Sequence, residues 1–166
     1  MGIKMGRSSR VRRRGGRRAR VQPVGAAPPV GDASENDIQA HLFTYMETLT
    51  TEDGLSVREH AFAVPNGMQI AGGPKARGKY MNAMKARGLT PGVSDVVLAM
   101  PRGWHPGAFF ELKREKNFVV SDEQLSFRKR MEDRGYYAVI VYGWEATKSC
   151  LDHYLNMGRP MWRFPL

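Results

Sequence analysis

Apolar residues along the chain follow two periods, one typical of helices and one typical of strands. Helical spacing predicts helices over residues 35–50, 80–87, 122–134 and 144–156. Continuous or alternating apolar runs predict strands over residues 57–64, 93–100, 107–114 and 136–142. Because helices and strands alternate along most of the chain, the pattern predicts an α/β sandwich with a mixed sheet flanked by helices.

Polar residues mark the starts of two predicted helices. Ser34 is a typical N-cap residue, and an acid at Glu35 suits the positive end of the helix dipole. Glu35 also lies on the apolar stripe, one turn before Ile38, so its side chain is expected to point along the core-facing side. Ser121 and Gln124 have the spacing of a capping box at the start of the third helix.

Two charged residues interrupt the apolar strand predicted over residues 107–114. Successive side chains of a strand alternate between its faces, so Glu111 and Lys113 share one face. Burying two charges costs free energy unless other groups compensate them. Only a short loop separates this strand from residues 93–100, which predicts an antiparallel hairpin on which Asp95 converges with Glu111.

The paired carboxylates predict a hard, oxygen-rich metal site. Neither His nor Cys lies close to Asp95 or Glu111 in the sequence, and carboxylate oxygens suit Mg²⁺ or Mn²⁺. Lys113 would orient or help to deprotonate a metal-activated water and offset developing charge. The alternative is a surface ion pair of Glu111 with Lys113 or Arg114 on an ordinary edge strand.

Four short motifs follow one another along the chain. They are the sequence GVSD at 92–95, the strand ending ELK at 111–113, the capping box at 121–124 and a Gly-Tyr pair at 135–136 before an apolar strand. In combination they resemble the virus-type replication-repair nuclease domain (VRR-NUC), a branch of the PD-(D/E)xK nuclease superfamily.

The resemblance covers nearly all of the globular part, from about Glu35 to Tyr154, and it includes Gln39 of the first predicted helix. It implies a restriction-endonuclease-like core, cleavage of DNA and a need for Mg²⁺ or Mn²⁺. One departure is visible, because Ser94 stands where the superfamily pattern has proline. Serine at this position removes no metal ligand.

The resemblance also assigns roles to five residues of this chain. Asp95, Glu111 and Glu35 would be metal ligands, and Lys113 would be the catalytic lysine. Gln124 would be the helix glutamine that supports the site. Simpler explanations remain open for two of them, because the capping box accounts for Gln124 and helix-start chemistry accounts for Glu35 without any catalytic role.

The formal net charge of +10 is concentrated at one end of the sequence. Residues 1–31 contain nine of the 26 Lys and Arg residues and none of the 16 acidic ones. Residues 1–33 have almost nothing to bury and are predicted to be a disordered, basic N-terminal arm. Nucleic-acid phosphate is its expected contact, through residues that include Arg12, Arg13, Arg14, Arg17 and Arg18. The alternative is a solubility, localisation or expression tail.

The domain organisation follows from this division. Residues 34–158 are predicted to form one nuclease-like domain, and residues 159–166 a C-terminal tail. A second basic cluster precedes Asp95 within the domain. It is expected either to grip the DNA backbone near the cut or to be a solvated surface, and it comprises Lys75, Arg77, Lys79, Lys85 and Arg87.

Several other classes of protein are excluded or disfavoured. Cys150 is the only cysteine, so neither an intramolecular disulfide nor a thiolate metal cluster is expected, and an intracellular setting follows. The four histidines lack the spacing of zinc ligands. No apolar run approaches the roughly 18 residues that a membrane span needs, and no phosphate-binding loop motif is complete.

These observations lead to three hypotheses. The first is a metal-dependent, structure-selective or nicking DNA endonuclease, of the kind typical of a phage or mobile element. The second is a homodimeric Holliday-junction resolvase, and the third is a nucleic-acid-binding protein without catalysis.

Overall fold

The computed structural model of the protein describes residues 31–65 and 73–161, except for the side chains of Lys75 and Arg77. Most of the predicted arm, with its five named arginines, and the end of the predicted C-terminal tail lie outside the described residues. So do Asn66 and Gly67 of a turn that the sequence suggests after the first strand.

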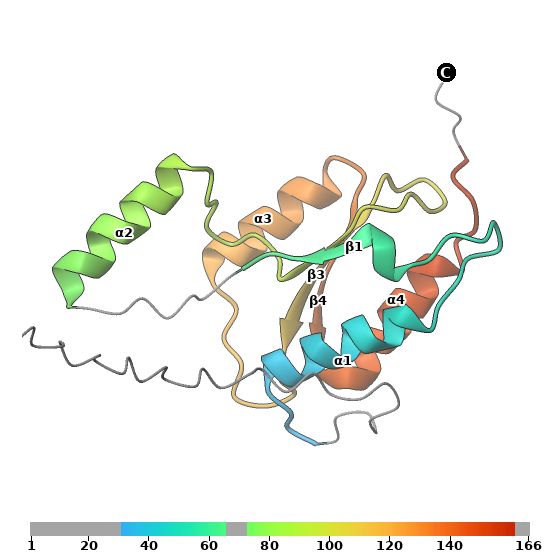
Figure 1. The fold of residues 1–166 in the computed structure, drawn as a ribbon, viewed down its shortest axis with the longest axis horizontal. Coiled ribbons are helices and arrows are strands. Elements are labelled where there is room, and N and C mark those ends of the chain that lie inside the picture. Colours follow the sequence, from blue (N-terminus) through green and yellow to red (C-terminus); the bar gives the residue numbers. More distant parts are fainter. Residues whose placement is uncertain (1–30, 66–72, 162–166) are drawn as a thin grey trace, which may run out of the picture.

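One mixed sheet forms the centre of the molecule (Figure 1). Its strands lie in sequence order as β1 (Ala61–Ala63), β2 (Val96–Leu98), β3 (Ala108–Lys113) and β4 (Tyr137–Tyr142). The β1–β2 and β2–β3 pairs are antiparallel, and the β3–β4 pair is parallel. The predicted α/β class with a mixed sheet is therefore confirmed, as is the antiparallel hairpin.

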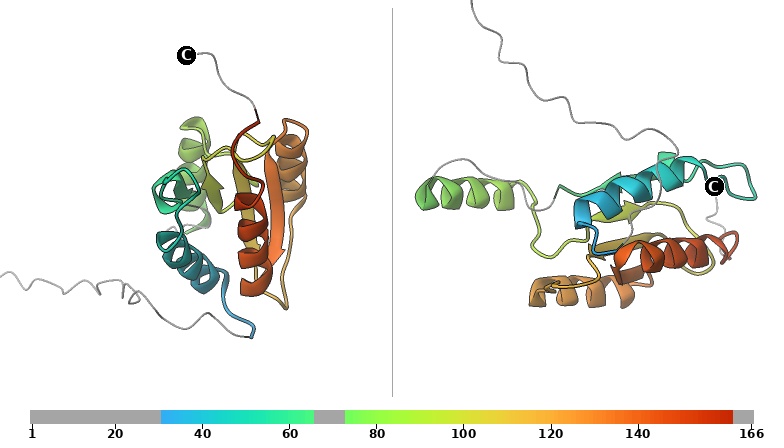
Figure 2. Two further views of the ribbon diagram at one scale, coloured as in Figure 1. Left: turned by 90° about the vertical axis from the view of Figure 1, so that its right-hand side faces the viewer. Right: turned by 90° about the horizontal axis from the view of Figure 1, so that it is seen from below.

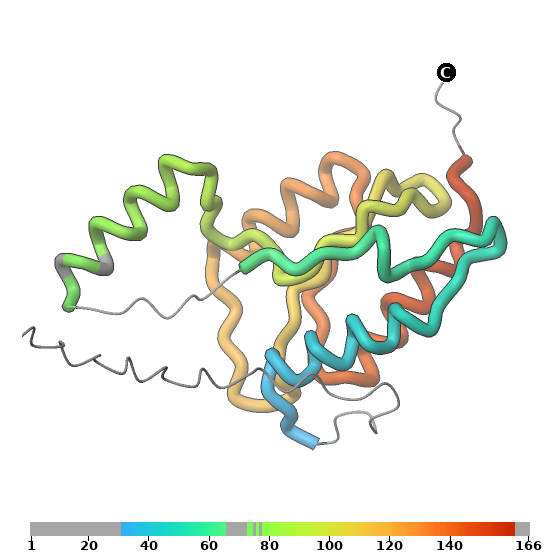
Figure 3. Tube along the Cα trace, viewed as in Figure 1, coloured from blue at the N-terminus to red at the C-terminus, as the bar shows by residue number. Residues whose placement is uncertain are grey.

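Helices cover both faces of this sheet (Figure 2). The helices are α1 (Glu35–Glu47), α2 (Pro74–Ala86), α3 (Asp122–Glu132) and α4 (Gly143–Leu155), with a short 3₁₀ helix at Arg58–His60. The α1 and α4 helices pack together on one face, and α3 packs on the other. The α2 helix extends away from the sheet, and the trace returns from it to β2 near the start of α3 (Figure 3). None of the helices in the described part of the chain is long and apolar enough for a membrane span.

The hydrophobic core lies between the sheet and the α1–α4 layer. Phe110 and Leu112 of β3 are fully buried there. Phe109, which points to the opposite face, packs its ring against Phe127 of α3 at a centroid distance of 5.5 Å. The strand thus alternates as predicted, and Glu111 lies on the face that α3 covers. The helices contribute to the core mainly through Ile38, Leu42, Met46, Trp144, Leu151 and Tyr154.

Two elements differ from the sequence prediction. The strand expected over 57–64 is reduced to Ala61–Ala63, preceded by the 3₁₀ helix. There the Arg58 guanidinium donates to the Ala61 carbonyl, and a ring nitrogen of His60 contacts the Ser56 carbonyl. Such local bonds between side chain and backbone compete with strand pairing.

The second difference is α2, which begins at Pro74 rather than near residue 80. Proline is favoured at the first position of a helix, because its fixed φ suits the helix and its missing N–H is not needed there. The other predicted helices and strands differ from the observed ones by at most three residues at either end.

Gly92 allows the segment before β2 to approach the start of α3. Its φ of +78° lies in the left-handed region, and a Cβ there would lie 2.3 Å from the Glu123 carbonyl group and 2.7 Å from the Gln124 nitrogen. No side chain larger than hydrogen fits without moving the backbone of α3. This close approach lies three residues before Asp95, against the N-terminal turn of α3.

Replacing Gly92 with Ala is therefore expected to lower the free energy of unfolding by about 2 kcal/mol or more, because it adds a backbone clash to conformational strain. Gly135→Ala is the matched control. Gly135 also has a positive φ, +83°, but nothing lies within 4 Å of its Cβ position, so only strain of about 1 kcal/mol applies. Urea unfolding measures both, and equal losses would contradict the role of close packing.

Candidate functional site

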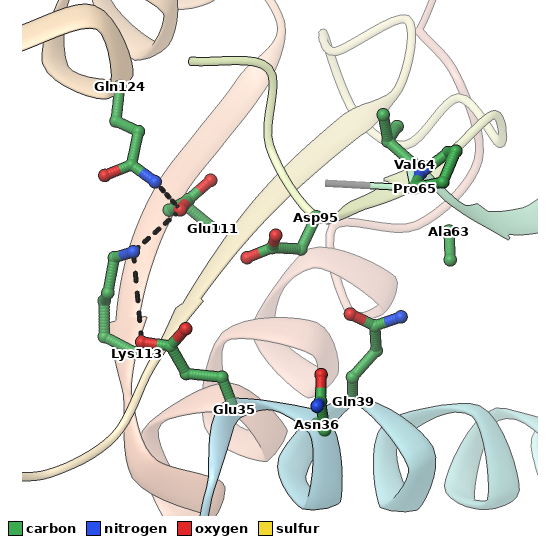
Figure 4. A pocket seen from close by; sticks show the side chains of 10 residues that line it. All are labelled: Glu35, Asn36, Gln39, Ala63, Val64, Pro65, Asp95, Glu111, Lys113 and Gln124. Atoms are coloured by element: carbon green, nitrogen blue, oxygen red, sulfur yellow. Dashed lines mark hydrogen bonds and ion pairs between the residues drawn. The ribbon is translucent and has the colours of Figure 1, made fainter. Parts of the chain in front are cut away.

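A cavity of about 610 Å³ opens beside the ends of β1 and β3 (Figure 4). It is bounded by the start of α1, the end of β1, the residue before β2, the end of β3 and the start of α3. All five residues to which the resemblance assigns roles line this cavity. The full lining is Glu35, Asn36, Gln39, Ala63, Val64, Pro65, Asp95, Glu111, Lys113 and Gln124.

Asp95 is held by backbone groups of both neighbouring strands. The register that pairs Val96 with Phe110 continues to set Asp95 opposite Glu111. The Asp95 carboxylate accepts a hydrogen bond from the Leu112 N–H at 3.0 Å, and its carbonyl accepts one from the Val64 N–H at 2.8 Å. Its side chain is therefore oriented before any ligand arrives.

Glu111 is a buried carboxylate, with 2% of the residue exposed. Its Oε1 accepts from Lys113 Nζ at 3.0 Å and from the Gln124 amide. Its Oε2 is buried and has no hydrogen-bond partner among the described residues. Burial, and next the negative charge of Asp95, raise the pKa of Glu111 from its ordinary 4.5 to about 7, although Lys113 opposes the shift.

Lys113 connects Glu111 with α1. Its side chain is 7% exposed, and its Nζ lies 3.9 Å from a carboxylate oxygen of Glu35, whose side chain is 45% exposed. Glu35 therefore faces the cavity and forms the outer end of a chain of charges that runs inward to Glu111. Ion pairs buried to this degree contribute little net stability, because desolvation offsets their attraction.

Gln124 has two contacts that serve different purposes. Its Oε1 accepts from the Ser121 N–H at 2.9 Å, while Ser121 Oγ accepts from the Gln124 N–H, so the predicted capping box is present. Its amide nitrogen donates to Glu111 Oε1. The capping role does not exclude contact with the site, since one side chain makes both.

Comparison with known proteins identifies the fold. No protein-family model matches the sequence, and no curated protein matches it. A solved structure described as a VRR_NUC domain protein is similar, with a TM-score of 0.66 and 18% sequence identity over 79% of this chain and 95% of that chain. The protein has a VRR-NUC-like fold. At this identity the likeness concerns the fold alone.

Within this VRR-NUC-like fold, the cavity suits a small hard cation. The buried, unpartnered Oε2 of Glu111 lies beside a second carboxylate, and oxygen is the ligand type that Mg²⁺ and Mn²⁺ prefer. No group of three or more His, Cys, Asp or Glu side chains among the described residues is arranged to hold a metal ion. Mg²⁺ commonly binds through one or two carboxylates with waters and substrate oxygens, so Asp95 and Glu111 are the residues that could hold one.

Glu35 as a third metal ligand stays a prediction. Its contact in the structure is with Lys113.

The second basic cluster does not line the cavity. All five of its members belong to α2 or directly follow it, and α2 packs extensively on no other helix or strand of the described residues. Lys79, Lys85 and Arg87 are exposed. The side chains of Lys75 and Arg77 lie outside the described residues. Their role in DNA binding stays a prediction.

Five lining residues were assigned no functional role from the sequence, although Gln39 is part of the resemblance: Asn36, Gln39, Ala63, Val64 and Pro65. Helical spacing indicates that two of them lie near Glu35. Gln39 lies four positions after Glu35 and three after Asn36, so its side chain emerges near both of theirs on α1. The other three enter through the pairing of β1 with β2, which the sequence does not specify.

The raised pKa of Glu111 predicts a pH dependence of stability. The folded protein retains this proton up to pH about 7, whereas the unfolded chain releases it near 4.5. The folded state therefore binds more protons between these values, and the stabilisation present below pH 4.5 is lost as the pH rises toward about 7. The shift corresponds to a loss of up to about 3 kcal/mol.

Urea unfolding of wild type and Glu111→Gln in EDTA measures this contribution, because the variant lacks the titrating group. Glu123→Gln is the control. Glu123 is exposed and its pKa is lowered, chiefly by a hydrogen bond to backbone, so it is ionised in both states through most of this window. A constant difference between wild type and Glu111→Gln across the window would contradict the raised pKa.

Proposed function

We propose that the protein is a metal-dependent endonuclease that hydrolyses DNA phosphodiester bonds, acting on branched structures or as a nicking enzyme. The observation that carries the proposal is the convergence of Asp95, Glu111 and Lys113 on one cavity, with Glu111 Oε2 buried and without a hydrogen-bond partner in the described part of the chain. The VRR-NUC-like fold supports a nuclease, because the similar solved structure is named for a nuclease domain.

In this proposal the cavity residues have different roles in hydrolysis. Asp95 and Glu111 hold Mg²⁺ or Mn²⁺ through carboxylate oxygens, with Glu35 as an additional acid. When bound, the ion supplies positive charge that offsets charge developing on the scissile phosphate and makes water a better nucleophile. Lys113 orients the attacking water and stabilises negative charge through its ammonium group. Gln124 holds the Glu111 carboxylate in place by donating to Oε1.

The state of Glu111 links ion binding to proton release. With a pKa of about 7, the metal-free carboxyl group is partly protonated at neutral pH. Glu111 would hold a cation in its ionised form, so it would release its proton on binding, and binding would weaken as the pH falls. Lys113, already 3.0 Å from Oε1, favours the same ionised form.

Basic residues outside the cavity supply the affinity for DNA in this proposal. The five residues of the second basic cluster and the arginines of residues 1–31 neutralise phosphates without reading sequence. No acid interrupts α2, and three of its cluster's side chains are exposed. Binding and chemistry therefore depend on different parts of the chain.

The proposal predicts that isosteric changes at the three central residues abolish cleavage. Asp95→Asn, Glu111→Gln and Lys113→Met are each expected to lower kcat/KM by about a hundredfold or more, because each removes a charge at the reacting phosphate. DNA affinity, measured by fluorescence anisotropy, is expected to survive. Lys129→Met, which removes a charge from an exposed position of α3, is the control that retains activity.

The assay uses linear, flapped and four-way DNA with Mg²⁺, Mn²⁺ or EDTA. Full activity in any of the three variants would sink the proposed site. DNA binding with no cleavage under any metal condition would favour the purely nucleic-acid-binding protein. Symmetric paired nicks confined to four-way junctions, together with a dimer in solution, would identify a resolvase.

Gln124 offers a test that separates stability from chemistry. Gln124→Ala loses both the cap and the contact with Glu111, and is expected to lower the free energy of unfolding by about 1 kcal/mol. Gln124→Glu retains an acceptor for the Ser121 N–H and most of that stability, yet it sets a carboxylate against Glu111. Cleavage is expected to fall in both variants, and wild-type cleavage by Gln124→Glu would reduce Gln124 to a helix cap.

A further inference from the structure

The cavity has two unlike halves (Figure 4). One half holds all of its charged groups, which are Glu35, Asp95, Glu111 and Lys113. The other half, away from Lys113, is neutral. It is bounded by two amide side chains of α1 and by the end of β1, which contributes Ala63, Val64 and Pro65. The hydrolytic chemistry proposed above uses only the charged half.

The two amides of the neutral half are Asn36 and Gln39. They lie three positions apart on α1, so both emerge on the side of the helix that faces the cavity. Figure 4 shows both extending from α1 toward the space beside Asp95. Among the described residues, neither side chain takes part in a hydrogen bond or an ion pair. Every charged residue of the cavity, by contrast, is already engaged.

The chemistry of this half matches a nucleoside better than a phosphate. A phosphate carries charge and only accepts hydrogen bonds, whereas none of the described residues that line this half of the cavity is a cation. An amide both donates and accepts, and the edges of nucleic-acid bases present donors and acceptors side by side. Val64 and Pro65 add apolar surface, which suits the flat face of a base or the carbon atoms of a sugar.

We propose that the neutral half binds the nucleoside next to the scissile phosphate, with Asn36 and Gln39 hydrogen-bonding to the edge of its base. This inference rests on the proposed nuclease function, since it takes the phosphate at Asp95 and Glu111 as its reference point. It makes the amides specificity-determining residues. Recognition at the cut then depends on a base as well as on the backbone.

The test combines two protein variants with a modified substrate. Asn36→Ala and Gln39→Ala each remove one amide, and an abasic nucleotide is moved through the positions that flank the wild-type cut. Dissociation constants are measured by anisotropy in Ca²⁺. Each change alone is expected to weaken binding about threefold to tenfold, as for the loss of one neutral hydrogen bond. At the contacted nucleotide the two changes together are expected to weaken binding no more than one of them alone, so the two losses do not multiply, because both remove the same contact.

Mn²⁺ affinity is the second readout, and it is expected to be the same in both variants as in wild type. Asn156→Ala, which removes an exposed amide at the far end of α4, is the matched control and is expected to change neither measurement. Losses that multiply at every nucleotide would overturn the proposal in favour of a backbone contact. A fall in Mn²⁺ affinity would overturn it in favour of a metal ligand, and an unchanged dissociation constant would overturn it outright.

A failure of the nuclease proposal is distinguishable from these outcomes. If the wild type cleaves no DNA, the abasic position is scanned along the whole bound strand. Non-multiplying losses with Gln39→Ala at one nucleotide then support the base contact even without cleavage. Multiplying losses throughout the strand overturn it.

Discussion

The buried contact between Glu111 and Lys113 is the constraint on which the rest of the site depends. Two charges that are almost wholly removed from water are costly, and a second carboxylate at Asp95 adds repulsion. Three elements contribute partial compensation: Lys113 from β3 itself, Gln124 from α3 and, through Lys113, Glu35 from α1. The unpartnered oxygen and the raised pKa of Glu111 show that compensation is incomplete. Buried carboxylates with a raised pKa are common at functional sites.

The same strand builds the core and the site. The alternation of β3 directs Phe110 and Leu112 into the core and Glu111 and Lys113 toward the cavity. Packing on the apolar face helps to fix the strand and so holds Glu111 and Lys113 in place. Gly92 adds a contact between the two sides of the site. Because it has no side chain, the segment before β2 can reach the start of α3.

Charge is distributed unevenly over the molecule. Among the described residues, Lys113 is the one cation that lines the cavity, whereas the exposed cations of α2 lie outside it. The cavity is thus acidic and suited to a cation, while α2 is basic and suited to phosphate. This separation explains why net charge alone points to a nucleic-acid partner but says little about chemistry.

By itself the sequence determined the features that depend on near neighbours along the chain. Strand alternation predicted that Glu111 and Lys113 share a face, and the capping box predicted the start of α3. The short loop predicted the hairpin that brings Asp95 to Glu111. The prediction from the apolar pattern was wrong for the 3₁₀ helix before β1, where local hydrogen bonds compete with strand pairing, and for the start of α2, where a proline begins the helix. Only the tertiary structure decided how deeply Glu111 is buried, which oxygen lacks a partner, and that Asn36, Gln39 and the end of β1 complete the cavity. Those facts depend on contacts between residues far apart in the chain, and the local spacing of apolar residues does not predict such contacts.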